Sequence, residues 1–162
     1  MKHKTVIYPG TFDPIHMGHI DIIERASRIF DEVIIAIAVN IDKNPLFSVE
    51  ERIDLAIDAT SHIDNIKAHS TDGLIANFAK EHNACGLIRG LRHVSDFEFE
   101  FQMATMNNHL NPLVSTLLMV TSDKYVHLNS SMVKNVSKLN GDIEKYVPDN
   151  VLKALKQKFS HN

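Results

Sequence analysis

Two histidines stand three positions apart where an apolar run passes into a helical pattern. The run from Thr5 to Tyr8 stops at Pro9-Gly10, as a strand that ends in a sharp turn does. From Gly18 onward, apolar residues recur every three or four positions, which is the period of an amphipathic helix. His16 and His19 therefore fall at the start of a predicted helix.

The start of a helix is suited to binding phosphate. Its first backbone N–H groups lack partners inside the helix, and the aligned peptide dipoles add partial positive charge. Gly10 and Gly18 allow a tight turn and a close approach of the backbone to a ligand. Two imidazoles on one face of the turn can donate hydrogen bonds to phosphoryl oxygens. The segment predicts a nucleotide phosphate site; a metal site and two solvated histidines are the alternatives.

Composition limits the classes of protein that fit. A chain of 162 residues with a net charge of −3 predicts one domain, residues 1–162, with a real core and no nucleic-acid partner. Cys85 is the single cysteine, so a disulfide within the chain is excluded, a reducing cytoplasm is favoured, and we expect Cys85 in the core. The apolar run before Pro9 is too short for a signal peptide, and no stretch approaches the length of a membrane span.

Strands and helices alternate along the remaining sequence. After the first helix, strands are predicted at 33–39, 66–70, 86–89 and 114–120, and helices at 48–61, 74–82, 131–139 and 148–159. Residues 97–101 alternate as a strand would, but a capping box beginning at Ser95 and the length of the segment favour a helix. This order predicts an α/β fold with a doubly wound, five-stranded parallel sheet.

Ligands of such sheets bind beyond the carboxyl ends of the strands, where the strand order reverses. The loops after the first, second, fourth and fifth strands carry the turn 11–19, Lys43, the segment 90–92 and the segment 129–131. We therefore expect these four segments to meet at one edge. The sequence has no G-x-G-x-x-G motif, so a redox dinucleotide site lacks support.

Four segments in the same order carry a resemblance to a known family. They are Thr11-Phe12-Asp13-Pro14 with His16-Met17-Gly18-His19, then Ile88-Arg89-Gly90-Leu91-Arg92, then Asp96 to Glu100, and finally Leu128 to Lys134. Together they resemble the HxGH nucleotidyltransferases, and are most similar to the bacterial phosphopantetheine adenylyltransferase family.

That resemblance implies a Rossmann-like fold and a reversible reaction. The phosphate of 4′-phosphopantetheine would attack the α-phosphate of ATP directly, giving dephospho-coenzyme A and pyrophosphate, with no covalent enzyme intermediate. Such in-line transfer depends on positioning and on stabilising charge. The family also implies Mg²⁺ held mostly by phosphate oxygens and water, with no protein metal ligand, a place in coenzyme A biosynthesis, and a homohexamer.

The resemblance further assigns roles to single residues. The catalytic residues are His19, Lys43 and Arg92, and the substrate contacts are Thr11, Lys43, Ile75 and Arg89. The residues matched to ATP contacts are Thr11, Phe12, His16, His19, Gly90, Leu91, Arg92, Glu100, Tyr125, Val126, His127, Leu128, Asn129, Ser130 and Ser131. Asn129 departs from the family, which usually has three hydroxyl residues at 129–131, although Asn can also cap a helix.

Other functions fit parts of the sequence. A different HxGH transferase, such as a nicotinamide mononucleotide adenylyltransferase or a cytidylyltransferase, shares the histidine turn, but segments 89–92 and 96–100 favour the first assignment. A nucleotide sensor without turnover does not need His19, Lys43 and Arg92 together. A histidine metal site has no nearby third ligand beyond Asp13. Phe97, Phe99 and Phe101 are expected in the core or in a subunit contact.

Overall fold

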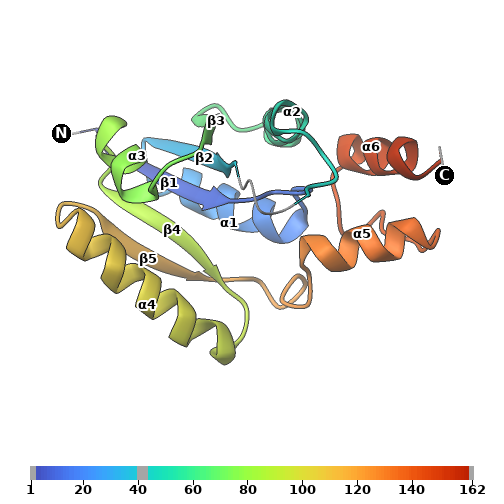
Figure 1. Ribbon diagram of the computed structural model, residues 1–162. Helices are drawn as coiled ribbons and strands as arrows, with labels where there is room; N and C mark the ends of the chain where they lie inside the picture. Colours follow the sequence, from blue (N-terminus) through green and yellow to red (C-terminus); the bar gives the residue numbers. More distant parts are fainter. Residues whose placement is uncertain (1–2, 40–43, 161–162) are drawn as a thin grey trace.

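The computed structural model describes residues 3–39 and 44–160. Five strands form one sheet in the order β3-β2-β1-β4-β5, and every neighbouring pair is parallel. The strands are β1 (Thr5–Gly10), β2 (Glu32–Ala38), β3 (Ile66–Thr71), β4 (Gly86–Leu91) and β5 (Ser115–Val120) (Figure 1). The predicted α/β fold is confirmed, and the order reverses between β1 and β4.

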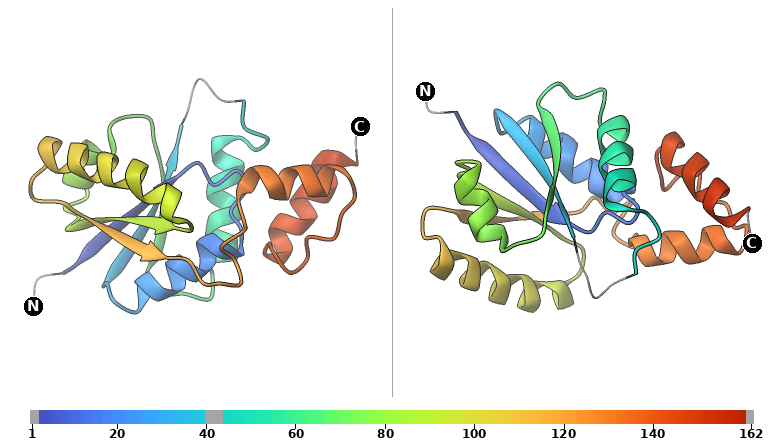
Figure 2. Two further views of the ribbon diagram at one scale, coloured as in Figure 1. Left: turned by 90° about the horizontal axis from the view of Figure 1, so that it is seen from below. Right: turned by 45° about the horizontal axis from the view of Figure 1, so that its top comes forward.

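The described residues also form six helices. They are α1 (Met17–Ser27), α2 (Val49–Ala59), α3 (Ile75–Glu81), α4 (Val94–Leu110), α5 (Ser130–Lys138) and α6 (Asp149–Phe159). Ser48 caps α2 in the predicted capping box: its hydroxyl accepts from Glu51 N at 3.2 Å, and Glu51 Oε2 accepts from Ser48 N at 2.8 Å. Figures 1 and 2 show α5 and α6 beyond the carboxyl ends of the strands. None of the helices in the described residues is long and apolar enough to cross a bilayer.

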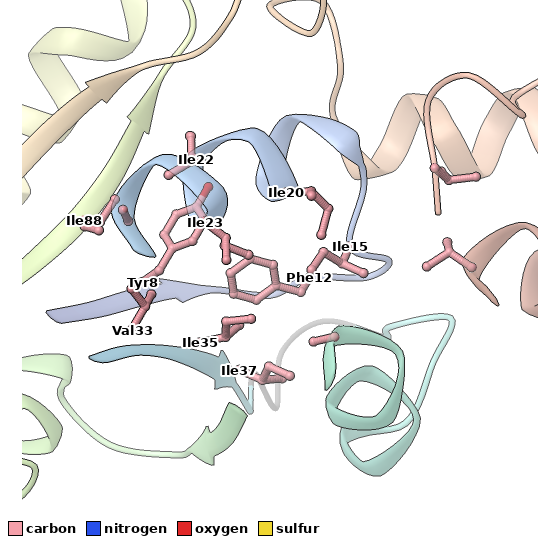
Figure 3. Close-up of a cluster of buried hydrophobic side chains, with 14 of the residues drawn as sticks. Tyr8, Phe12, Ile15, Ile20, Ile22, Ile23, Val33, Ile35, Ile37 and Ile88 are labelled. Atoms are coloured by element: carbon pink, nitrogen blue, oxygen red, sulfur yellow. The ribbon is translucent and has the colours of Figure 1, made fainter. Parts of the chain in front are cut away.

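The larger part of the core lies between the sheet and α1, α2 and α6. Figure 3 shows Tyr8 and Phe12 next to Ile22 and Ile23 of α1, and all four are buried. Alternate residues of β1 and β2 face this cluster, because successive side chains of a strand point to opposite faces. The turn that carries His16 and His19 is therefore supported by a well-packed core.

The second part of the core lies on the opposite face, under α3. Ile7, Ile34 and Leu87 pack there against Phe78 and Ala79. Because both faces of β1 and β2 are covered, their sequences are nearly continuous apolar runs.

Two local expectations are wrong. Helix α4 begins at Val94, not after Ser95, because the Asp96 carboxylate accepts hydrogen bonds from the backbone N–H groups of Arg92 and His93 at 3.2 and 3.3 Å. Cys85 is exposed, whereas we expected it in the core. It lies immediately before β4, between buried Ala84 and Gly86.

Helix α4 buries polar residues and exposes large apolar ones. Its buried residues are Glu100 and Asn107. Its exposed residues include six large apolar side chains: Phe97, Phe99, Phe101, Met103, Met106 and Leu110. The helix prediction at 97–101 is thus confirmed, and these side chains do not belong to the core of one chain.

Candidate active site

A cleft of about 630 Å³ opens over the carboxyl ends of β1 and β4. It is lined from β1 and the turn after it, from the end of β4, from the segment after β5 and from the start of α5. This is the edge where the strand order reverses, the place where open parallel sheets bind ligands. Three of the four expected segments meet there.

The two histidines cap α1 together. His16 is the N-cap residue, and its Nδ1 accepts a hydrogen bond from Gly18 N at 3.2 Å. His19 Nδ1 in turn accepts from His16 N, also at 3.2 Å. The rings are stacked with their centroids 3.7 Å apart and their planes inclined by 24°. Imidazoles therefore do here what a hydroxyl and a carboxylate do in an ordinary capping box.

This hydrogen bonding fixes the protonation of both rings. A nitrogen that accepts from a backbone N–H carries no proton, so each neutral ring carries its proton on Nε2. Burial lowers the pKa of His16 to about 3, with a further contribution from the charge of Arg92. Burial also lowers the pKa of His19 well below its usual value, helped by His16 and Arg92. Both rings are neutral near pH 7 and have Nε2–H available as a donor.

The turn before α1 leaves little room for larger side chains. A Cβ on Gly18 would lie 3.1 Å from Cε1 of the His16 ring. Phe12 has a φ of 48°, a left-handed conformation that is unusual for a bulky residue. Its ring packs edge-on against Tyr8 and His19, with centroid distances of 5.3 and 4.9 Å. Packing thus helps to hold a strained turn at the cleft.

Arg92 supplies positive charge from the end of β4. Its Nη1 donates to Leu128 O at 3.2 Å, and its Nε lies 3.4 Å from Asp96 Oδ2. The side chain remains 38% exposed and lines the cleft. Its planar guanidinium can bind two phosphate oxygens at once.

Helix α5 brings a second N-terminus to the cleft. Asn129 is its N-cap, and Oδ1 accepts from Met132 N at 2.8 Å. Capping by Asn129, as expected, is confirmed. Ser130 Oγ donates to Pro14 O at 2.9 Å and so ties α5 to the turn after β1. Two helix N-termini therefore border one cleft, and the dipole of each favours an anion. The expectation of unpartnered amides is wrong at α1, because Met17 N donates to Tyr146 O and Gly18 N donates to His16 Nδ1.

A charged pair that the sequence did not predict lies in the wall of the cleft. Lys134 Nζ lies 2.5 Å from Asp13 Oδ2, and Asp13 is 3% exposed. The Asp13 carboxylate also accepts from Leu46 N and Phe47 N at 3.0 and 2.9 Å. Asp13 thus joins α5, the β1 turn and the residues before α2. Both residues lay inside the quoted motifs, but nothing in sequence spacing pairs residues 121 positions apart.

Arg89 and Glu100 form a different arrangement from the expected one. The two side chains are bonded to each other, and Arg89 Nη1 also donates to Pro9 O at 3.1 Å. Neither residue lines the cleft. The hydrogen bonds to Glu100, helped by its charge, raise the pKa of Arg89 above its usual value.

The cleft contains most of the residues matched to ATP. The predicted residues that line it are Thr11, Phe12, His16, His19, Gly90, Arg92, Tyr125, Leu128, Asn129, Ser130 and Ser131. Those outside its lining are Ile75, Arg89, Leu91, Glu100, Val126 and His127. Lys43 lies outside the described residues. Lining residues that were not predicted include Tyr8, Ile22, Asn44 and Thr121.

The residues at the cleft fit a magnesium ion that arrives on a nucleotide. Asp13 is the one acidic residue among the described lining residues, and its oxygens are occupied by two backbone amides and Lys134. No group of three His, Cys, Asp or Glu residues suited to a metal was found in the described residues. Phosphate oxygens and water would therefore supply most ligands of such an ion.

Comparison with known proteins identifies a family and two similar relatives. The cytidylyltransferase-like family matches residues 7–136. A curated phosphopantetheine adenylyltransferase of Caldanaerobacter subterraneus subsp. tengcongensis is 48% identical over 156 residues, which cover 96% of this chain and 98% of the relative. One of Clostridium botulinum (strain Alaska E43 / Type E3) is 50% identical over 149 residues, which cover 92% and 94%.

A solved structure shares the fold. It comes from Vibrio parahaemolyticus, and its protein carries the provisional name nicotinate-nucleotide adenylyltransferase. The TM-score is 0.68, and the match covers 96% of this chain and 93% of that one. At 18% identity this likeness shows the fold alone.

Proposed function

The chain belongs to the phosphopantetheine adenylyltransferase family of the cytidylyltransferase-like proteins, and we propose that it transfers the adenylyl group of ATP to 4′-phosphopantetheine. The products are dephospho-coenzyme A and pyrophosphate, and the step belongs to coenzyme A biosynthesis. The observation that carries this proposal is identity of about half the residues, over more than nine-tenths of the chain, to relatives of that name.

The neutral ring of His19 is the proposed donor to the reacting phosphate. Its Nδ1 is occupied by His16 N, so its free N–H is on Nε2. A preorganised donor in a partly dry site stabilises the charge that develops as the α-phosphate is attacked, and needs no proton transfer of its own. His16, stacked on His19, is proposed as a second donor to the nucleotide phosphates.

Cationic side chains and helix N-termini would neutralise the remaining charge of the phosphates. Arg92, the N-terminus of α5 and the hydroxyl of Ser131 line the cleft and would hold the β- and γ-phosphates. A magnesium ion bound to those phosphates would neutralise part of their charge. Positioning and charge then provide most of the rate increase, as phosphoryl-type transfers require.

The acceptor would enter from the side of Arg89. Thr11, which lines the cleft, would touch both substrates, and Arg89, Ile75 and Lys43 would contact phosphopantetheine. Arg89 lies three residues before Arg92, at the same strand end. Its present bonds to Glu100 and Pro9 O mean that a substrate phosphate must compete with them or use a free edge of the guanidinium.

Assembly and compartment are part of the same proposal. Several large apolar side chains of α4 are exposed, which is typical of a contact surface, and we assign them to the homohexamer that the family implies. A single cysteine in the sequence favours the cytoplasm.

Pyrophosphate release tests the proposal directly. The purified protein is incubated with ATP, Mg²⁺ and a panel of acceptors: 4′-phosphopantetheine, nicotinamide mononucleotide, nicotinate mononucleotide and phosphocholine. Release is expected with 4′-phosphopantetheine alone, and dephospho-coenzyme A should appear in equal amount. His19→Ala serves as the inactive control. Release with a mononucleotide instead would contradict the proposal and favour another transferase of this fold.

A further inference from the structure

Arg52 is a buried cation behind the cleft. It lies in the first half of α2 and is 1% exposed, the largest fully buried side chain of the described residues. Its Nη1 donates to Thr11 O at 2.8 Å and to Ala38 O at 3.0 Å, and its Nε donates to Ser48 O at 3.3 Å. One guanidinium therefore joins the turn after β1, the end of β2 and the start of α2.

Packing alone does not require a charge at this position. Taking a guanidinium out of water costs several kcal/mol before its new hydrogen bonds are counted, and an apolar side chain of similar size fills such a space without that cost. The planar fork of arginine can reach three carbonyl oxygens in fixed directions, which lysine cannot. The burial of a charged Arg52 thus indicates that it holds these carbonyl groups in position.

The bond to Thr11 O has a direct consequence for the next amide. The Thr11–Phe12 peptide is trans, so its C=O and N–H groups point in opposite directions. Arg52 holds the carbonyl from the α2 side. The Phe12 N–H must therefore point away from Arg52, and both Thr11 and Phe12 line the cleft.

This amide is free to bind a ligand as far as the described residues show. No hydrogen bond from Phe12 N to another of these residues is found. Phe12 has a φ of 48°, a conformation that persists only where its surroundings hold it. Its ring is held by Tyr8 and His19, and its preceding peptide is held by Arg52.

We propose that Arg52 is a positioning residue that aims the Phe12 amide at a phosphate in the cleft. Arg52 does not touch the ligand; it acts through the Thr11–Phe12 peptide. By also holding Ala38 O, it keeps the carboxyl ends of β1 and β2 in register with each other. The inference rests on the proposed function only in taking a phosphate as the ligand of the cleft.

The test observes the Phe12 amide itself. The chain has eight phenylalanines, so labelling with ¹⁵N-phenylalanine gives about eight backbone signals, and Phe12→Leu identifies the one from Phe12. Magnesium pyrophosphate is the probe. In the unmodified protein we expect the Phe12 signal to shift on saturation. In Arg52→Lys we expect that shift to fall by more than half and the Kd for pyrophosphate to rise by roughly tenfold to a hundredfold, as for a donor misplaced by about 1 Å.

A matched control separates this role from a loss of stability. Val151→Ala removes packing in α6 at a fully buried residue that does not line the cleft. It should lower the Tm and leave both the Phe12 shift and the Kd unchanged. In Arg52→Ala, added guanidinium ion should restore part of the affinity for pyrophosphate. The same addition should not change the affinity of Val151→Ala for pyrophosphate.

Two results would overturn the inference. One is an Arg52→Lys protein that melts lower but keeps the Phe12 shift and the Kd, because Arg52 would then be structural only. The other is a Phe12 signal that pyrophosphate does not move in the unmodified protein. If the shift depends on Arg52 but no acceptor yields pyrophosphate, the inference stands and the proposed function falls.

Discussion

Arg89 and Glu100 meet through two parallel hydrogen bonds. Arg89 Nε donates to Oε2 at 2.7 Å and Nη2 donates to Oε1 at 2.8 Å. Glu100 is 7% exposed, so this carboxylate depends on Arg89 for its charge balance. We therefore expect Arg89 both to stabilise the fold and to bind the acceptor. The two roles can be separated by mutation.

Arg89→Met is expected to raise the KM for 4′-phosphopantetheine at least tenfold and to change the KM for ATP much less. It should also lower the free energy of unfolding by about 2–4 kcal/mol, because it leaves the Glu100 charge buried and unpaired. Steady-state kinetics with each substrate varied in turn, and urea unfolding, measure the two effects.

The double variant Arg89→Met with Glu100→Leu is the control for that experiment. An apolar pair can replace a buried ion pair with little loss, so stability should return while the KM for 4′-phosphopantetheine stays high. If the double variant recovers both stability and KM, Arg89 has no direct contact with the acceptor.

His19→Ala should lower kcat by about 10²–10³-fold, the usual effect of removing one donor aimed at a transition state. The affinity for ATP should change modestly, because the donor acts mainly on the charge that develops during transfer. Pre-steady-state turnover and equilibrium ATP binding provide the two numbers. Equal losses in rate and affinity would mean that His19 only binds the nucleotide.

Sequence patterns identified the sheet and the histidine turn because these features are local. The runs before Pro9 and after Asp31 consist of residues buried on both faces of a sheet, and such burial leaves a clear apolar signature. His16 and His19 were placed at a helix start for the same reason. That they would cap it was not predicted, since histidine is not among the preferred N-cap residues.

Contacts between segments that are far apart in the sequence could not be recognised from sequence patterns. Arginine is mostly exposed in proteins, so the burial of Arg52 could not be predicted from its place on a helical pattern. The pairing of Asp13 with Lys134 depends on α5 returning to the β1 turn. Glu100 was matched to an ATP contact and Arg89 to a substrate contact, and nothing in the sequence indicated that the two side chains bond to each other.

The buried histidines should make stability depend on pH. The pKa of His16 is lowered to about 3 and that of His19 is also lowered, so the folded protein binds fewer protons than the unfolded chain between about pH 3 and 6.5. Stability is therefore fully present above about pH 6.5 and falls as pH decreases, by up to about 1.4 kcal/mol per pH unit for each ring.

Urea unfolding of the unmodified protein and of His16→Asn at pH 5, 6 and 7 measures this effect. Asparagine can still cap α1 but does not titrate, so the variant should lose stability less steeply between pH 7 and pH 5. Identical slopes for the two proteins would show that His16 is not held neutral.

Asn129→Ser should leave kcat/KM for ATP unchanged or raise it, because serine caps a helix as well as asparagine does and restores the hydroxyl that the family usually has. Asn129→Ala is the matched control: it removes the bond from Met132 N and should cost about 1 kcal/mol of stability. A large loss of activity in the serine variant would reveal a role for the Asn129 NH₂ group.

The exposed apolar residues of α4 should hold copies of the chain together. Phe101 is 59% exposed, and Phe101→Glu would place a charge in the proposed contact, where an unpaired charge is costly. Multi-angle light scattering should give about six times the 18.3 kDa chain mass for the unmodified protein and a smaller species for the variant. Leu139→Glu is the control, since Leu139 is 81% exposed directly after α5 and away from α4. It should keep the full mass, and an unmodified protein of 18.3 kDa in solution would contradict the proposed assembly.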